Sequence, residues 1–180
     1  MYEFLWNGRG GQGAFTAAKI LGAAYSLKDE NKFSLAFPSF GPERRGAPVK
    51  AFTKLSTSKI GDRSEVKNAD FEIFLDDTLF NESLLSNLKP NGKVILCSKN
   101  TYSNPNIISF DGLSLAQKIL KLPITNTVIL GAVIAVFKEV SLDDISHAIE
   151  QLMPKQLQCR NIEAVTEAYN HVLELVWKSY

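Results

Sequence analysis

A glycine-rich segment near the N-terminus constrains the fold of this chain more than any other feature. The segment Gly8-Arg9-Gly10-Gly11-Gln12-Gly13 follows a short, weakly alternating apolar stretch at residues 2–7. After it, at residues 14–27, apolar and small residues recur every three or four positions. This order predicts a strand, a tight turn that only glycine permits at several positions, and a closely packed helix.

Strand and helix patterns continue to alternate along the first two thirds of the chain. Short apolar or alternating runs predict further strands at 33–37, 49–55, 71–75 and 94–97, the second of these a half-exposed antiparallel partner. A helix that Asp77 or Thr78 can cap is expected between the last two strands. We therefore predict an α/β fold with three layers, α/β/α, and a largely parallel sheet.

The C-terminal third is predicted to be mostly helical. Asp111 precedes one helical pattern, and Ser141 and Asp144 have capping-box spacing before another. Residues 128–137 are apolar on nearly all sides, so that helix is expected to be central to the fold or pressed against another subunit, and a last helix is expected at 160–177. With 180 residues, the chain is expected to form a single domain, 1–180.

Charge and hydropathy exclude several classes of function. The net charge of +1 offers no overall field that would bind nucleic acid or an anionic membrane. The longest apolar run covers about half of what spans a bilayer. Because no secretory signal is recognisable at the N-terminus, a cytoplasmic protein is expected. Cys97 and Cys159 lie far apart in the sequence and far from His147 and His171, so neither an iron–sulfur cluster nor a closed zinc site is expected.

The glycine segment is also a candidate anion site. It satisfies G-x-G-x-x-G, and the unpaired amides of the helix that follows suit a phosphate, with Arg9 adding a full charge. A dinucleotide enzyme should have an acidic residue closing the second strand, yet that strand ends in Phe37-Pro38-Ser39. A phosphate-loop NTPase needs Lys and Ser or Thr where Ala14 and Phe15 stand. A structural role in strand-to-helix packing stays open.

Two further segments are candidates for the same site. The loop 38–48 carries the adjacent arginines Arg44 and Arg45 among three prolines and two glycines, and it follows a strand, where open α/β sheets bind ligands. The alternative is a solvated loop in which Glu43 pairs with an arginine. The turn Thr125-Asn126-Thr127 precedes the apolar helix and presents hydroxyl and amide groups at its positive end, although helix capping alone also explains it.

Three segments together resemble the gamma subunit of 2-oxoacid:ferredoxin oxidoreductases. They are the glycine segment 8–13, the loop 37–49 (FPSFGPERRGAPV) and the stretch 122–132 (LPITNTVILGA), and the resemblance runs in order over almost the whole chain. It implies membership of a cytoplasmic complex that decarboxylates a 2-oxoacid such as pyruvate, reduces ferredoxin and forms an acyl-coenzyme A. It also implies alpha, beta and delta type partner subunits, which would hold thiamine diphosphate and the iron–sulfur clusters.

The resemblance further implies that this chain is a non-catalytic subunit associated with coenzyme A. Gly8 to Gly13, with Arg44 or Arg45 and the turn Thr125 to Thr127, would then bind the phosphates of coenzyme A. Two alternatives remain: an assembly subunit without a ligand, in which the arginine loop pairs with acidic groups of a partner, and a free-standing nucleotide-binding enzyme.

Overall fold

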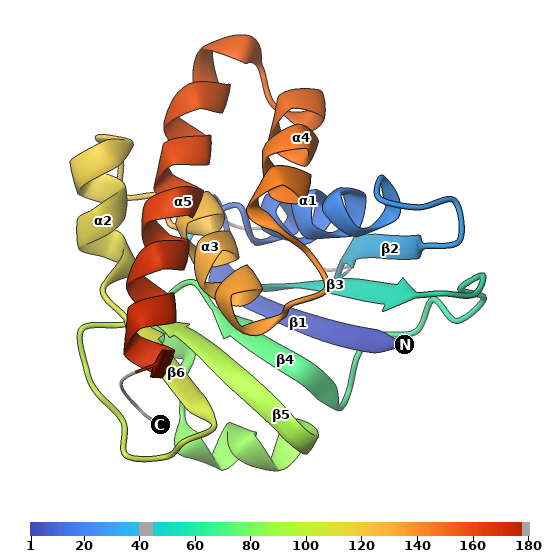
Figure 1. The fold of residues 1–180 in the computed structure, drawn as a ribbon. Coiled ribbons are helices and arrows are strands. Elements are labelled where there is room, and N and C mark those ends of the chain that lie inside the picture. The colour runs from blue at the N-terminus through green and yellow to red at the C-terminus, as the bar shows by residue number, and fades with distance from the viewer. Residues whose placement is uncertain (40–44, 178–180) are drawn as a thin grey trace.

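The computed structural model describes residues 1–39 and 45–177. Within these ranges, six strands form one sheet in the order β2-β3-β1-β4-β5-β6 (Figure 1). The strands are β1 (Tyr2–Arg9), β2 (Phe33–Pro38), β3 (Pro48–Ser56), β4 (Ala69–Phe74), β5 (Leu88–Cys97) and β6 (Ile107–Phe110). The α-helices are α1 (Ala14–Ser26), α2 (Gly112–Ile119), α3 (Asn126–Val136), α4 (Leu142–Leu152) and α5 (Lys155–Trp177).

Strand pairing confirms the predicted α/β class. β1 pairs with β4, β4 with β5 and β5 with β6, all in parallel, whereas β3 runs antiparallel to both β1 and β2. The antiparallel strand expected at 49–55 is therefore confirmed as β3. Its expected half-exposure is wrong, because residues 51–56 are all buried and Lys54 is covered and paired with Glu3 and Asp62. The carboxyl ends of β1 and β4 lie side by side, because Asn7 of β1 is in register with Phe74 of β4.

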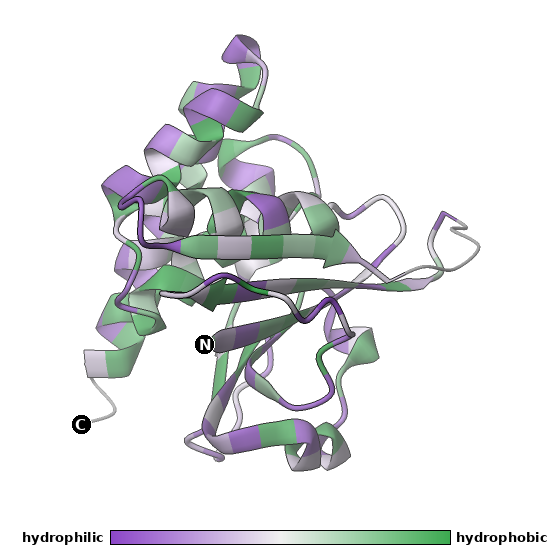
Figure 2. Ribbon diagram, turned by 90° about the vertical axis from the view of Figure 1, so that its right-hand side faces the viewer, coloured by the Kyte–Doolittle hydropathy of each residue, from purple (hydrophilic) through white to green (hydrophobic). Residues whose placement is uncertain are grey.

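The α-helices lie on one face of this sheet, and two short 3-10 helices, η1 (Asp77–Leu79) and η2 (Glu82–Asn87), lie on the other (Figures 1 and 2). Alternate residues of a strand lie on opposite faces of the sheet and pack into different apolar clusters. Phe4, Trp6 and Ile95 join the main core beneath the helices, whereas Phe74 and Leu96 pack beneath the 3-10 segments. The three layers are present, and the second outer layer is built from 3-10 turns and loops.

The prediction of an α-helix between the strands at 71–75 and 94–97 is wrong. The side chain of Asp76 accepts the backbone N–H of Thr78, and that of Asn81 accepts the N–H of Ser83, so each starts a short turn of its own instead of continuing one helix. β5 begins early, at Leu88. It contains Asn91, whose φ of 66° lies in the left-handed region.

The C-terminal third is helical, as predicted. Both side chains of the capping box, Ser141 and Asp144, make their reciprocal bonds at the start of α4. α3 packs so closely on α5 that a Cβ at Gly131 would collide with the carbonyl oxygen of Val165. In the part of the chain that the structure describes, every helix is too short or too polar to cross a bilayer.

Candidate functional site

The glycine segment leaves β1 at the carboxyl edge of the sheet and enters α1. Gly11 and Gly13 have φ values of 96° and 80°, which residues with a side chain rarely adopt. Gly46 and Ala47, which precede β3, lie on this segment, since Gly10 N–H donates to Ala47 O at 2.8 Å and Gly46 N–H donates to Gly10 O at 3.1 Å. The structure therefore brings together the glycine segment and the end of the arginine loop.

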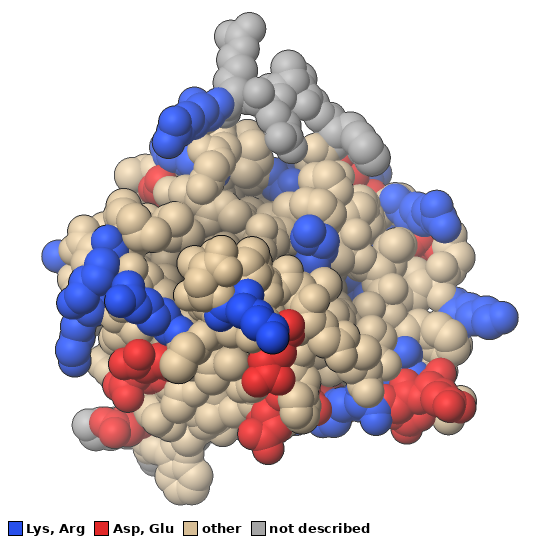
Figure 3. Space-filling model, turned by 90° about the horizontal axis from the view of Figure 1, so that it is seen from above, with Lys and Arg blue, Asp and Glu red and all other residues tan. Residues whose placement is uncertain are grey.

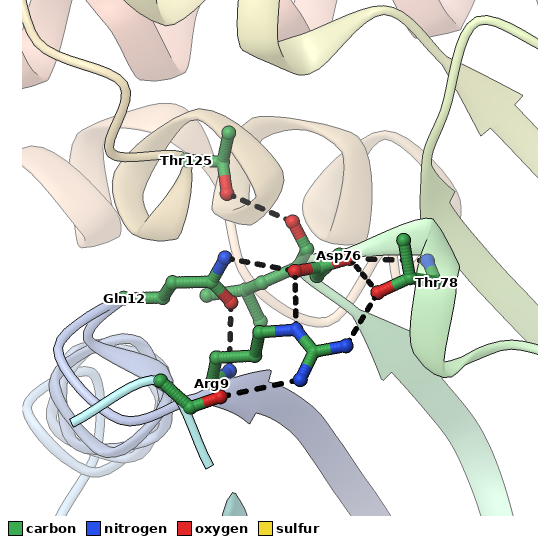
Figure 4. Close-up of polar contacts among 7 residues, drawn as sticks. Arg9, Gln12, Asp76, Thr78 and Thr125 are labelled. Carbon is green, nitrogen blue, oxygen red and sulfur yellow. Dashed lines mark hydrogen bonds and ion pairs between the residues drawn. The ribbon is translucent and has the colours of Figure 1, made fainter. Parts of the chain in front are cut away.

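Arg9 holds three neighbouring loops together (Figure 4). Its Nε lies 3.0 Å from Asp76 Oδ2, and its two terminal nitrogens donate to Gly46 O at 3.2 Å and to Thr78 Oγ1 at 2.8 Å. The planar guanidinium suits this fork of acceptors. The cation that the sequence suggested for a phosphate is thus already paired with a carboxylate.

Asp76 is a member of this site that the sequence reasoning missed. Its Oδ2 also accepts Gln12 Nε2 at 3.2 Å, and Gln12 Oε1 in turn accepts the Arg9 N–H at 2.7 Å. Burial by itself raises the pKa of Asp76, but hydrogen bonds from Thr78 and Gln12 and the charge of Arg9 outweigh it and hold that pKa below its ordinary value. The sequence does show that Asp76 directly follows the strand predicted at 71–75, but the position of that strand beside β1 comes from the sheet order.

The turn at residues 125–127 lies beside the glycine segment, but its side chains make internal contacts. Thr125 donates to Leu75 O at 3.2 Å (Figure 4), and Thr127 donates to Asn161 Oδ1 on α5 at 2.7 Å. Thr125 occupies the N-cap position of α3 without capping it through its side chain. Asn126 lies against Gly13, where an added Cβ would come within 2.5 Å of Asn126 Nδ2.

The start of α1 retains the features of an anion site. Gly13 provides no side-chain cap, the first turn has no acidic residue, and open space surrounds the position of a Cβ at Gly11. Arg45 is exposed and, among the residues that the structure describes, forms no hydrogen bond or ion pair. Arg44, the other arginine named for this site, lies outside the described residues.

The sheet order argues against a dinucleotide site. In the dinucleotide fold, β2 lies beside β1 and its end reaches the ribose. Here β3 separates β1 from β2, so the end of β2 is displaced by one strand. Within residues 1–39 and 45–177, no group of three or more His, Cys, Asp or Glu side chains is placed to hold a metal ion.

Comparison with known proteins identifies a family. The sequence model described as pyruvate ferredoxin/flavodoxin oxidoreductase matches residues 3–171. The pyruvate synthase subunit PorC of Methanothermobacter marburgensis is 41% identical over 172 residues, which cover 94% of this chain and 96% of that protein. The common gamma subunit of the pyruvate/ketoisovalerate oxidoreductases of Thermococcus litoralis is 37% identical, with coverage of 94% and 96%.

A solved structure has the same fold. The crystal structure of the pyruvate oxidoreductase subunit PORC from Thermotoga maritima superposes with a TM-score of 0.80 at 29% identity. The alignment covers 94% of this chain and 95% of that one. The likeness therefore extends from the glycine segment through the C-terminal helices.

Proposed function

Because the chain belongs to the pyruvate ferredoxin/flavodoxin oxidoreductase family, as a chain of its gamma type, we propose that it assembles with thiamine-binding and iron–sulfur subunits in the cytoplasm. The complex would oxidatively decarboxylate a 2-oxoacid such as pyruvate, reduce ferredoxin and form an acyl-coenzyme A. The alpha, beta and delta type subunits would carry thiamine diphosphate and the clusters, and this chain would act as a single non-catalytic domain.

The chemistry of the site supports a non-catalytic role. A general base should have a pKa near the working pH, whereas the pKa of Asp76 is lowered and its carboxylate is occupied by Arg9, Gln12 and Thr78. The cysteine at the carboxyl end of β5, Cys97, is buried, and burial raises the pKa of its thiol to about 11. Neither group is prepared for proton transfer or nucleophilic attack at neutral pH.

Coenzyme A binding is the finer part of the proposal. The observation that carries it is the start of α1, which is uncapped, free of acidic residues and open above Gly11. We assign phosphate contact to these backbone amides and to Arg45, whose guanidinium is exposed. Arg9 has a supporting role, because its guanidinium holds the glycine segment against Asp76 and Gly46.

Calorimetry of the assembled complex, kept anaerobic and titrated with coenzyme A, tests this assignment. Arg45→Ala should weaken the affinity by about tenfold, as expected for the loss of one charged contact to a phosphate. Arg63→Ala is the matched control, since Arg63 is also exposed and forms no ion pair within the described part of the chain. Equal affinities for the two variants would remove Arg45 from the ligand site.

A purely structural role is the second candidate. It is favoured by the contacts of Arg9, which already satisfy the guanidinium without a ligand. In that case Arg45 pairs with acidic groups of a partner subunit. Arg45→Ala would then leave coenzyme A affinity unchanged and lower the amount of partner that co-purifies with the chain.

A further inference from the structure

A small cavity lies on the helical side, at the N-terminus of α3. It lies between the connection that joins α2 to α3 and the beginning of α5, and its volume is about 290 Å³. Asn126 lines it and also contacts Gly13, so the cavity adjoins the glycine segment. The lining residues are Leu120, Leu122, Ile124, Asn126, Met153, Gln156, Leu157, Arg160 and Asn161.

The walls of this cavity are apolar and partly exposed. Leu122 and Leu157 expose 52% and 46% of their surface, and Leu152, which directly precedes Met153, exposes 50%. Neighbouring exposed leucines that border a hollow are typical of a protein interaction site. We name this surface the α3–α5 pocket.

The polar groups of the α3–α5 pocket favour an acidic occupant. None of its lining residues is acidic, and the first turns of both α3 and α5 lack acidic residues, so two positive helix ends are uncompensated. Lys155 and Arg160 are exposed and form no ion pair within the described residues. Figure 3 looks down on the helical side of the molecule and shows Lys and Arg side chains spread over this face, with Asp and Glu side chains among them.

A donor that lacks a partner lies in the wall of the cavity. Asn126 is only 8% exposed, its Oδ1 accepts the Thr127 N–H, and its Nδ2 makes no hydrogen bond with any described residue. The Nδ2 atom is accessible, since Glu72 Oε2 is the one buried side-chain polar atom without a partner among the described residues, so an acceptor can reach it. A carboxylate or carbonyl of an incoming chain would supply that acceptor.

We propose that the α3–α5 pocket docks a segment of a partner subunit in which a large apolar side chain stands next to a carboxylate. The inference rests on the proposed function, which supplies the partner. The apolar side chain would enter between Leu122 and Leu157, and the carboxylate would face Arg160 and the helix ends. A volume of about 290 Å³ is at the lower limit for a drug-sized ligand and suits a single anchoring side chain.

A second copy of this chain is the poorer occupant. A two-fold dimer through this face would be self-complementary and would bring Lys155 and Arg160 of one copy toward the same residues of the other. With two uncompensated helix ends on each side, such an interface would oppose like charges. The positive charge around the α3–α5 pocket therefore favours an acidic segment of a different chain over a second copy of this one.

The test uses the co-expressed complex, purified anaerobically through a tag on this chain. Leu157→Asp and Arg160→Glu should each weaken retention of the partner subunit by about tenfold or more, as for central interface residues, whereas Arg160→Lys should stay within about threefold of wild type. Leu157→Asp should not harm folding, because it places a carboxylate in the first turn of α5. Leu113→Asp, an exposed leucine in the first turn of α2, is the matched control.

The outcomes separate the possible failures. If the wild-type chain retains its partner and Leu157→Asp retains it equally well, the docking inference is wrong and the proposed function stands. If the wild-type chain retains no partner, the docking inference and the proposed function are both wrong. Three other results would each overturn the docking assignment. The first is an equal loss of partner for Leu113→Asp and Leu157→Asp, and the second is a loss of coenzyme A affinity without a loss of partner. The third is self-association of the chain that Leu157→Asp abolishes.

Discussion

Replacing Arg9 by alanine should destabilise the chain itself, whatever the ligand. Arg9 links the end of β1 to the loop after β4 through Asp76 and Thr78, and to the loop before β3 through Gly46 O. Backbone hydrogen bonds from Gly10 to Ala47 and from Gly46 to Gly10 also join the glycine segment to the residues before β3. The variant removes all three side-chain contacts of Arg9 at once.

The free energy of unfolding lost in Arg9→Ala depends on how exposed the Arg9–Asp76 ion pair is. A hydrogen bond to a charged group contributes about 1.5–3 kcal/mol when buried, whereas an exposed ion pair contributes about 0–1 kcal/mol. The side chains of Arg9 and Asp76 are 34% and 17% exposed, and Asp76 keeps Gln12 and Thr78 as donors in the variant. We therefore expect Arg9→Ala to lower the free energy of unfolding by about 2 kcal/mol, and Arg9→Lys by roughly half of that.

Urea unfolding followed by tryptophan fluorescence measures this loss, because Trp6 lies buried on β1. The corresponding fall in melting temperature is about 4–8 °C for a chain of this size. The loss should shrink in acid, since the stability that a lowered pKa contributes is present above the ordinary carboxyl pKa and disappears as Asp76 becomes protonated. A change below about 0.5 kcal/mol at neutral pH, equal to that of Arg63→Ala, would refute the structural role of Arg9.

Two further variants test the core. Gly131→Ala should cost about 2 kcal/mol in thermal or urea unfolding despite the better helix propensity of alanine, because its Cβ meets backbone atoms of α5, whereas Gly61→Ala, with open space around it, should be nearly neutral. Glu72→Gln should change the pH dependence of stability: burial raises the pKa of Glu72, and Oε2 has no partner among the described residues. Wild-type stability should therefore fall, relative to the glutamine variant, as pH rises through that raised pKa, and a pH-independent difference between the two would contradict this reasoning.

The elements with a strong local signal could be predicted from the sequence. The glycine segment between β1 and α1, the alternation of β3 and the capping box at Ser141 each depend on neighbouring residues alone. The strand β6 was missed. It is only four residues long, Ile107–Phe110, and its assignment depends on the backbone partners that β5 provides.

The candidate site was predicted in its location and only partly in its contacts. The sequence placed the glycine segment and the turn at residues 125–127 in one site, and the structure brings them together through Gly13 and Asn126. It could not show that Asp76, 67 residues from Arg9, neutralises the guanidinium, because that pairing depends on the order of the strands. Burial of the three turn side chains likewise depends on how α3 and α5 pack.

The most direct test of the proposed function is the composition of the complex that forms around this chain in the cell. A tagged chain, isolated without oxygen and weighed by native mass spectrometry, should carry a thiamine diphosphate-binding partner in fixed ratio. The isolated assembly should reduce ferredoxin only when a 2-oxoacid and coenzyme A are both supplied. A chain that purifies alone, from cells in which the 2-oxoacid-dependent activity resides in other fractions, would contradict the proposed function.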